Sequence, residues 1–433
     1  MNTKQFILSA AAISSTLLLS QCKKDEHHKN TKMFKVSIEN VQEPKMFFAS
    51  GVFDTPVGES AAGPAVPGKS FVFSFHAGKG HKLSFTTMFG RSNDLFFGPD
   101  GNGIALYNGD TPVSGDITDQ IKLWDAGTEV NEAPGMGMYQ APTQPAPNTG
   151  PSESDPVQEI SMVNDGFTYP SVASTLKVTI ANDGNTMFTV TIDNLPGSFT
   201  PISPGAWVIH TNADPIFTAG MPDRGMGLES QAEDGNPTTL AAYLADNSGL
   251  VTPLSPGVWA VHKAGTYPLF KEGMLDYGEG LEMLAESADP TTLAASLLTK
   301  PGVKSSGVFN TPVGASGPGP ILPGNKYEFT IEAAEDDYLS FATMFGQSND
   351  SYYAFSDKGV ALWHHDDPLW GDQTSKVKLW DVGTEVNEYP GAGLHQPARG
   401  TGGTDESENV MEENDGFPYP ATPSVIKVTV TPL

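Results

Sequence analysis

Carboxylates recur at one spacing in two nearly identical stretches, LWDAGTEVNE at 123–132 and LWDVGTEVNE at 379–388. In the first copy Asp125 and Glu129 flank a glycine, which permits a turn that a side chain would resist. Such a turn can direct two carboxylates toward one point, and a preceding SND triplet adds Asp94. Ca²⁺ prefers several flexibly arranged oxygen ligands. The pattern therefore indicates either a calcium site or acids that merely cap turns.

Other metal and catalytic chemistries have weaker support. The stretch HHDD at 364–367 is matched in the other copy by NGDT at 108–111, so it predicts a solvated loop rather than a zinc site. His210 and His262 each follow a tryptophan by three residues, which places the two side chains on opposite strand faces and favours a structural hydrogen bond. The sequence contains no nucleophile elbow, HExxH motif, P-loop or dinucleotide fingerprint.

Carboxylates could also serve a glycosidase, which needs two acids across a cleft. The repeated acids instead cluster within one turn, as metal ligands do. We therefore expect no enzyme. An envelope carbohydrate-active enzyme that uses the clustered carboxylates is the alternative function.

Composition restricts the class of protein. The length of 433 residues suggests two or three domains, and the 46 glycines and 35 prolines favour a turn-rich β protein. The formal net charge is −27, which repels phosphate backbones and argues against nucleic-acid binding.

The N-terminal sequence predicts export and anchoring. Residues 1–21 have the character of a secretory signal peptide, and LLLSQC resembles a lipobox that ends at Cys22, the chain's one cysteine. We expect lipidation at Cys22, a polar tether over 22–32, and a surface-exposed outer-membrane lipoprotein that touches the membrane through its lipid alone. The alternative is an ordinary signal peptide with a bystander cysteine.

Internal repeats organise the rest of the chain. A long unit, here called the body, begins with SGVFDTPVG at 50–58 and again with SGVFNTPVG at 306–314. A shorter unit, the front segment, occupies 203–245 and 255–298.

A third repeat is a single strand, FKVSIENV at 34–41 and FTVTIDNL at 188–195. The chain order is therefore strand, body, strand, front segment, front segment, body. We expect a first domain at 33–185 and a second at 187–433 that contains both front segments. Because a body without a front segment would leave an apolar surface uncovered, we also expect 203–245 to fold back onto the first body.

Apolar and polar residues alternate over 34–38, and one apolar face per strand is typical of an antiparallel sandwich. Helices are expected after Asn236-Pro237 and Asp289-Pro290, because Asn or Asp caps a helix well and proline fits its first position. The predicted fold class is all-β, with two antiparallel β-sandwich domains and a few short helices.

The bodies resemble the spondin N-terminal domain, a family known from F-spondin, mindin and bacterial proteins. The resemblance rests on LSFTTMFGRSND at 83–94 followed by LWDAGTE, and on their second copies, which follow the family pattern LSFxTMxGxSxDW and then WDAGTD. GLEMLAESADPTTL at 280–293 is similar to a further family stretch, and the likeness covers nearly all of the mature chain. It implies a C2-like β-sandwich with a bound Ca²⁺.

The resemblance also implies which residues bind the metal. Glutamate at the last motif position departs from the family's aspartate and lengthens that side chain by one methylene. One glutamate of the front segments, Glu286 or Glu233, is a further expected ligand. By position, the implied ligands are Asp94, Asp125 and Glu129 in the first body and Asp350, Asp381 and Glu385 in the second.

Together these features predict a surface-anchored, calcium-binding lipoprotein for adhesion or ligand binding. Its expected partner is an extracellular protein or glycan that the sequence does not name. The aromatic pairs Phe96-Phe97 and Tyr352-Tyr353 could form a recognition patch, but we expect them in the core.

Overall fold

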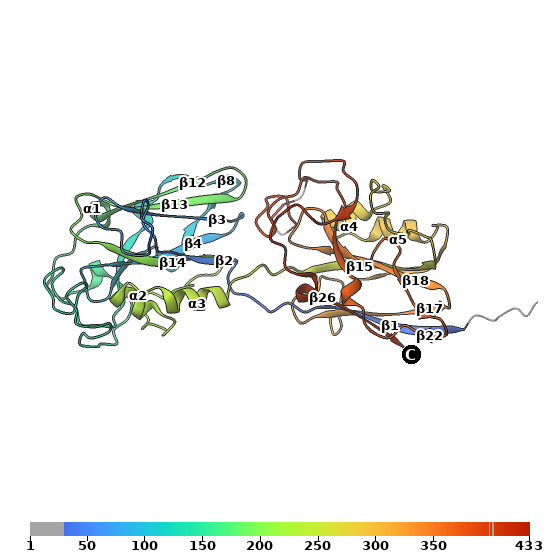
Figure 1. Ribbon diagram of the computed structural model, residues 1–433, viewed down its shortest axis with the longest axis horizontal. Helices are drawn as coiled ribbons and strands as arrows, with labels where there is room; N and C mark the ends of the chain where they lie inside the picture. Colours follow the sequence, from blue (N-terminus) through green and yellow to red (C-terminus); the bar gives the residue numbers. More distant parts are fainter. Residues whose placement is uncertain (1–29, 398, 401) are drawn as a thin grey trace, which may run out of the picture.

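The computed structural model describes residues 30–397, 399–400 and 402–433. It is mostly β, with several antiparallel sheets and a few short helices, which confirms the expected fold class. Figure 1 shows two sandwiches side by side along the long axis. The expected signal peptide, Cys22 and most of the tether lie outside the described residues. None of the described helices has the length and apolar character to cross a membrane.

The first sandwich has two sheets. The order in one is β11-β10-β5-β4-β14-β2, with β6 on β4: β2 (Ala49–Phe53), β4 (Lys82–Phe89), β5 (Leu95–Gly98), β6 (Ile104–Ala105), β10 (Lys122–Asp125), β11 (Gln158–Glu159) and β14 (Ile202–His210). The order in the other is β3-β13-β12-β9: β3 (Ser70–His76), β9 (Gly115–Asp116), β12 (Leu176–Asn182) and β13 (Met187–Asn194). Smaller elements are β7 (Tyr107–Asn108), β8 (Thr111–Pro112), η1 (Thr118–Gln120), η2 (Ile160–Met162) and α1 (Val172–Thr175).

The second sandwich repeats this plan. One sheet has the order β16-β15-β18-β19-β24-β25, with β20 on β18: β15 (Leu254–Lys263), β16 (Val303–Phe309), β18 (Asp337–Phe345), β19 (Ser351–Ala354), β20 (Val360–Ala361), β24 (Lys378–Asp381) and β25 (Met411–Glu412). The other has the order β17-β1-β26-β23: β1 (Thr31–Asn40), β17 (Lys326–Ala334), β23 (Gly371–Asp372) and β26 (Ile426–Pro432). Smaller elements are β21 (Trp363–His364), β22 (Asp367–Pro368), η3 (Thr374–Lys376) and α6 (Thr422–Val425).

Strand pairing differs from the boundaries 33–185 and 187–433. β1 pairs with β17 and β26 and thus completes the second sandwich, whereas β13 pairs with β12 and β3 in the first. The physical reason is loop closure: a four-residue connection, 183–186, makes β12 and β13 a hairpin at small entropic cost. The slot left in the second sandwich is filled by β1. The first sandwich is therefore inserted between β1 and β15.

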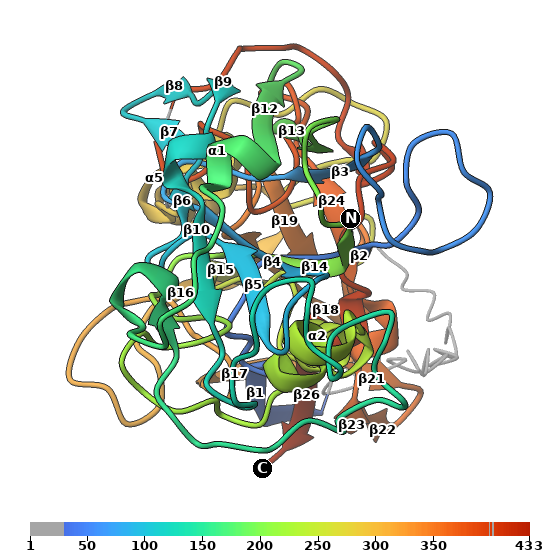
Figure 2. The same cartoon turned by 90° about the vertical axis from the view of Figure 1, so that its left-hand side faces the viewer.

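The first front segment lies on the first sandwich. Its strand β14 pairs with β4 and β2. Its helices α2 (Leu228–Asp234) and α3 (Thr238–Asp246) cover the outer face of that sheet, where Leu240 and Leu244 pack with Phe96 and Trp124. Figure 2 shows this layering of sheet, sheet and helix.

The second front segment supplies α4 (Leu281–Ser287) and α5 (Thr291–Leu297) to the second sandwich. Both expected helix starts are observed, although each proline is the residue just before its helix rather than the first helical residue. Asn236 accepts a hydrogen bond from the Thr238 amide at 3.1 Å. Asp289 accepts one from the Thr291 amide at 2.9 Å.

The two connections between the sandwiches run together. Phe47 and Ser248 form a parallel bridge. The Gln42 side chain donates to Leu250 O at 2.9 Å and accepts from the Thr252 amide at 2.8 Å. These bonds fix the crossing of the chain from the second sandwich to the first and back.

Candidate metal centre

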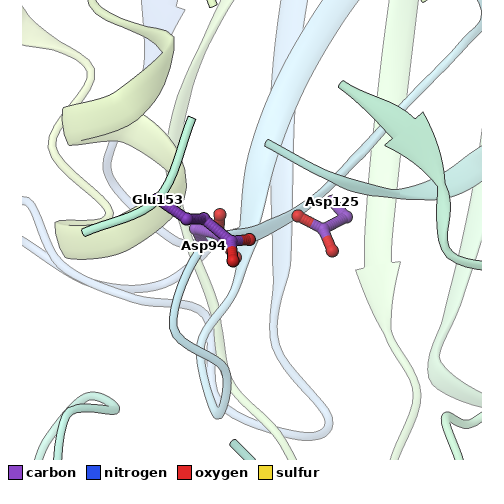
Figure 3. Close-up of side chains that lie close together, drawn as sticks. All are labelled: Asp94, Asp125 and Glu153. Carbon is purple, nitrogen blue, oxygen red and sulfur yellow. The ribbon is translucent and has the colours of Figure 1, made fainter. Parts of the chain in front are cut away.

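Three carboxylates converge in the first sandwich. Oxygens of Asp94, Asp125 and Glu153 lie within 4.8 Å of one another. Figure 3 shows these three side chains close together. Asp94 directly precedes β5 and Asp125 ends β10, and the pairing of β5 with β10 sets Asp125 opposite Leu95. Strand register thus brings these two aspartates together.

Glu153 is positioned by backbone hydrogen bonds of a loop rather than by strand register. Its segment lies antiparallel to the turn after β10: the Glu153 amide donates to Thr128 O at 2.9 Å, and the Asp155 amide donates to Gly127 O at 3.0 Å. Gly127 has φ +67°, and a Cβ there would lie 2.4 Å from Asp155 O. The glycine between the acids therefore permits both the turn and the close approach of the Glu153 segment.

Asp94 is fully buried, and its two oxygens have different surroundings. Oδ2 accepts from the Thr128 and Glu129 amides at 2.7 and 3.1 Å. Oδ1 has no hydrogen-bond partner among the described residues. Burial, followed by the negative charge of Asp125, raises the pKa of Asp94 well above its usual value. A buried, unpartnered carboxylate oxygen is costly unless a proton or a cation satisfies it.

Asp125 is held in place from both sides. Its Oδ1 accepts from the Gly127 amide at 2.7 Å, and its Oδ2 accepts from the Asn131 side chain at 2.6 Å. Burial raises its pKa, and burial followed by the charge of Asp125 raises the pKa of Glu153.

Glu129, an expected ligand, is placed differently. Its Oε1 accepts from the Gly150 backbone amide at 2.7 Å, and its Oε2 lies 3.5 Å from the side-chain Nδ2 of Asn93. It is not part of the converging group, and Glu153 takes the third place there. The glutamate four residues after Asp125 thus fastens the loop around Gly150.

The second sandwich repeats the arrangement around Asp350. Its Oδ2 accepts from the Thr384 and Glu385 amides at 2.8 and 3.1 Å, and its buried Oδ1 has no partner among the described residues. Burial, then the charge of Asp381, raises the pKa of Asp350 to about 8. Asp381 accepts from Gly383 N and from the Asn387 side chain at 2.6 and 3.0 Å.

The remaining acids of the second site follow those of the first. Glu385 accepts from the Gly403 amide at 2.8 Å and so fastens a loop, as Glu129 does. The Glu406 amide donates to Thr384 O at 2.8 Å, which makes Glu406 the counterpart of Glu153. Within the described part of the chain, convergence within 4.8 Å is found in the first sandwich.

One glutamate of each front segment borders the site in the same sandwich. Glu286 of α4 accepts from the Thr384 hydroxyl at 2.7 Å, and that hydroxyl lies 3.3 Å from Asp350 Oδ2. Glu233 of α2 is 2% exposed, and neither of its oxygens has a hydrogen-bond partner among the described residues. Burial raises the pKa of both glutamates to about 7.

The histidines and aromatic pairs have structural places. Nε2 of His210 lies 2.9 Å from Ser84 Oγ, and Nε2 of His262 lies 2.9 Å from Ser340 Oγ, as expected for structural hydrogen bonds. The HHDD stretch is exposed at the β21–β22 turn. The aromatic pairs are fully buried, which confirms the expectation that they are core: Phe96, Phe97, Tyr352 and Tyr353.

The converging Asp94, Asp125 and Glu153 could hold a metal ion. Their donors are oxygens alone, carried on strand ends and a turn. Comparisons with known proteins find no family model that matches the chain and no curated protein similar to it.

Proposed function

We propose that this chain is a calcium-binding adhesion or ligand-binding protein of the cell surface, with one Ca²⁺ site in each sandwich. The observation that carries the calcium site is the buried Oδ1 of Asp94, which has no hydrogen-bond partner in the described part of the chain, and the same feature recurs at Asp350. A cation beside these oxygens would offset both the desolvation of each carboxylate and its repulsion from the neighbouring aspartate.

Calcium fits this donor set better than other common metals do. The candidate ligands are carboxylates, without the cysteine or histidine that Zn²⁺ favours. They lie at two strand ends and on a long loop, an arrangement that suits the flexible geometry of Ca²⁺ more than the near-ideal octahedron of Mg²⁺. Asp94, Asp125 and Glu153 would bind the first ion, with Glu233 at its edge. Asp350, Asp381, Glu406 and Glu286 are the corresponding set.

The adhesion role and the anchor rest on the sequence. The spondin resemblance suggests binding of an extracellular protein or glycan, and the sequence around Cys22 suggests a lipid anchor. The start of β1 lies at the end of the second sandwich that faces away from the first (Figure 1). A tether before β1 would therefore project the first sandwich away from the membrane.

Calorimetry with the mature chain tests the metal sites. We expect two Ca²⁺ sites in the wild type, loss of one in Asp94→Asn, loss of the other in Asp350→Asn, and no change in the exposed control Asp119→Asn. At a Ca²⁺ concentration of about 100 Kd, each filled site should add about 2.7 kcal/mol to the free energy of unfolding. Equal melting temperatures in EDTA and in millimolar Ca²⁺ would refute the calcium sites.

A capture experiment tests the binding role. Envelope extracts or glycan arrays probed with the mature chain should give Ca²⁺-dependent binding that EDTA and Asp94→Asn remove. Turnover of a glycan without a retained partner would instead favour the carbohydrate-active enzyme.

A further inference from the structure

We infer that Ca²⁺ binding in the second sandwich and docking of the first sandwich onto it are thermodynamically coupled, whereas the first site is uncoupled. This inference rests on the proposed calcium sites. It assigns a role to the loop that follows the second site, whose described residues 387–397 and 399 also form the joint between the sandwiches.

The first residues of the loop are hydrogen-bonded to a proposed metal ligand or to a residue directly beside one. The Asn387 side chain donates to Asp381 Oδ2 at 3.0 Å. The Glu388 amide donates at 3.1 Å to the side-chain oxygen of Asn349, which directly precedes Asp350. A shift of either aspartate toward a cation is therefore transmitted to the start of the loop.

The same loop contacts the first sandwich. The ring of Tyr389 is stacked on that of His76, with centroids 3.7 Å apart and planes at 11°. A Cβ at Gly78 would lie 2.4 Å from Ala392 O, so the two backbones touch. The Arg399 guanidinium lies 3.3 Å from His81 Nε2. Leu394 packs against the core of the first sandwich.

The joint is not fully packed. A cavity of about 170 Å³ lies between the sandwiches, and its lining includes His76, Asn387, Glu388 and Tyr389. Asn387 thus both binds Asp381 and faces the joint. A joint held by a few side chains around a cavity can loosen at lower cost than a close-packed core.

The first sandwich supplies a natural control. Its loop is tied to the metal residues in the same way, since Asn131 donates to Asp125 at 2.6 Å and the Glu132 amide donates to Asn93 Oδ1 at 3.0 Å. At the position of Ala392, which is 0% exposed in the joint, this loop has Met136, which is 85% exposed. The loop after β10 lies at the end of the molecule remote from the second sandwich (Figure 1).

The coupling should be visible at His76. In NMR spectra of the full mature chain with ¹³C-labelled histidines, the ring current of Tyr389 should shift the signal of His76. The signal that disappears in His76→Gln is assigned to His76. We expect this shifted signal in Ca²⁺ and its movement in EDTA. Asp381→Asn in Ca²⁺ should reproduce the EDTA spectrum, whereas the matched variant Asp125→Asn should resemble the wild type.

Linkage requires the reverse effect as well. Gly78→Val should wedge the joint open from the first sandwich, where it touches none of the proposed ligands. It should weaken Ca²⁺ binding at the second site by roughly 5- to 150-fold, the usual range for coupled sites, and leave the first site unchanged. The neighbouring Lys79→Ala is the control and should change neither site.

Calorimetry on the same samples separates this inference from the proposed function. Two filled sites with an unmoved His76 signal, or with unaltered affinity in Gly78→Val, would overturn the coupling and leave the calcium sites standing. Absence of Ca²⁺ binding would overturn both.

Discussion

Val36, near the start of the described chain, pairs with Val430, near its end, and both are fully buried in the second sandwich. On its other edge β1 pairs with β17, where Val36 faces Phe329. The strand at the N-terminal end is therefore a central strand of the domain whose remaining strands follow Leu254. The whole first sandwich is folded between these two parts.

This arrangement predicts that residues 250–433 are incomplete without β1. Burial of Phe34, Val36 and Ile38 contributes about 1.5–3 kcal/mol for each side chain. We expect the isolated fragment to melt at a much lower temperature, and a peptide of residues 30–41 to restore much of the loss. The same peptide with Val36→Asp should fail, because it would bury an unpaired charge. A fragment that melts equally well with and without the peptide would show that the slot closes by itself.

A second truncation concerns the first front segment. Without residues 203–245 the first sandwich would lose β14 and uncover Phe96 and Trp124, both now buried beneath α2 and α3. Residues 46–249 should therefore melt at a higher temperature and bind less hydrophobic dye than residues 46–200. Equal dye binding would mean that the body buries this surface on its own.

The sequence predicts the strands at 34–41 and 188–195 but not which sandwich each one joins. The stretches 34–41 and 188–195 have the same alternation, so either could fill either sandwich. Loop closure decides between them: the short turn at 183–186 holds β13 against β12, and the remaining slot falls to β1. The competition of two similar strands for one position in a sheet depends on distant parts of the chain, so the residues of the strand itself do not reveal its outcome.

The candidate metal centre shows the same limit. Repetition identified Asp94 and Asp125, which strand register brings together. Repetition also predicts Glu129 and does not reveal Glu153, because a backbone hydrogen bond to Thr128 positions Glu153 in a loop whose two copies differ in length. An acidic residue shared by both loops, Glu153 and Glu406, was the available signal.

Glu153 and Glu129 should therefore respond differently to substitution. Glu153→Gln should raise the Kd of the first Ca²⁺ site by roughly tenfold or more, since Ca²⁺ affinity follows ligand charge. In EDTA it should not lower the melting temperature, because it removes repulsion from Asp125.

Glu129→Ala should do the reverse. It leaves the Gly150 amide without its carboxylate partner and should lower the free energy of unfolding in EDTA by about 1–3 kcal/mol. Calorimetry and thermal melting on both variants measure the two effects. Loss of stability in both, or loss of affinity in Glu129→Ala alone, would contradict the assignment of Glu153 as ligand.

Anchoring is tested at Cys22. Cys22→Ala should move the protein from washed membranes to the soluble fraction, because we expect only the lipid to hold it there. Cell fractionation followed by immunoblotting measures this change. Retention of the variant in membranes would indicate a protein partner or an uncleaved signal peptide.

Acid should weaken the joint between the sandwiches through His81. The ring is 5% exposed, and burial, followed by the positive charges of Arg399 and His210, lowers its pKa to about 3. Nδ1 accepts from the Gly78 amide at 3.1 Å, and Nε2 faces the Arg399 guanidinium, so a protonated ring would meet donors on both sides.

The sign follows from linkage. Because the folded pKa is below the unfolded value of about 6.5, the neutral ring stabilises the native state above that pH. This contribution is lost as the pH falls from about 6.5 toward 3, and at pH 5 the loss is about 2 kcal/mol. We expect the free energy of unfolding of the wild type to be higher than that of His81→Gln at pH 7.5. This difference should be smaller at pH 5. The comparison between the two proteins cancels the opposite trend of the buried carboxylates, whose raised pKa values favour the folded state in acid. A difference that stays constant over this range would show that His81 titrates normally and does not make the joint sensitive to acid.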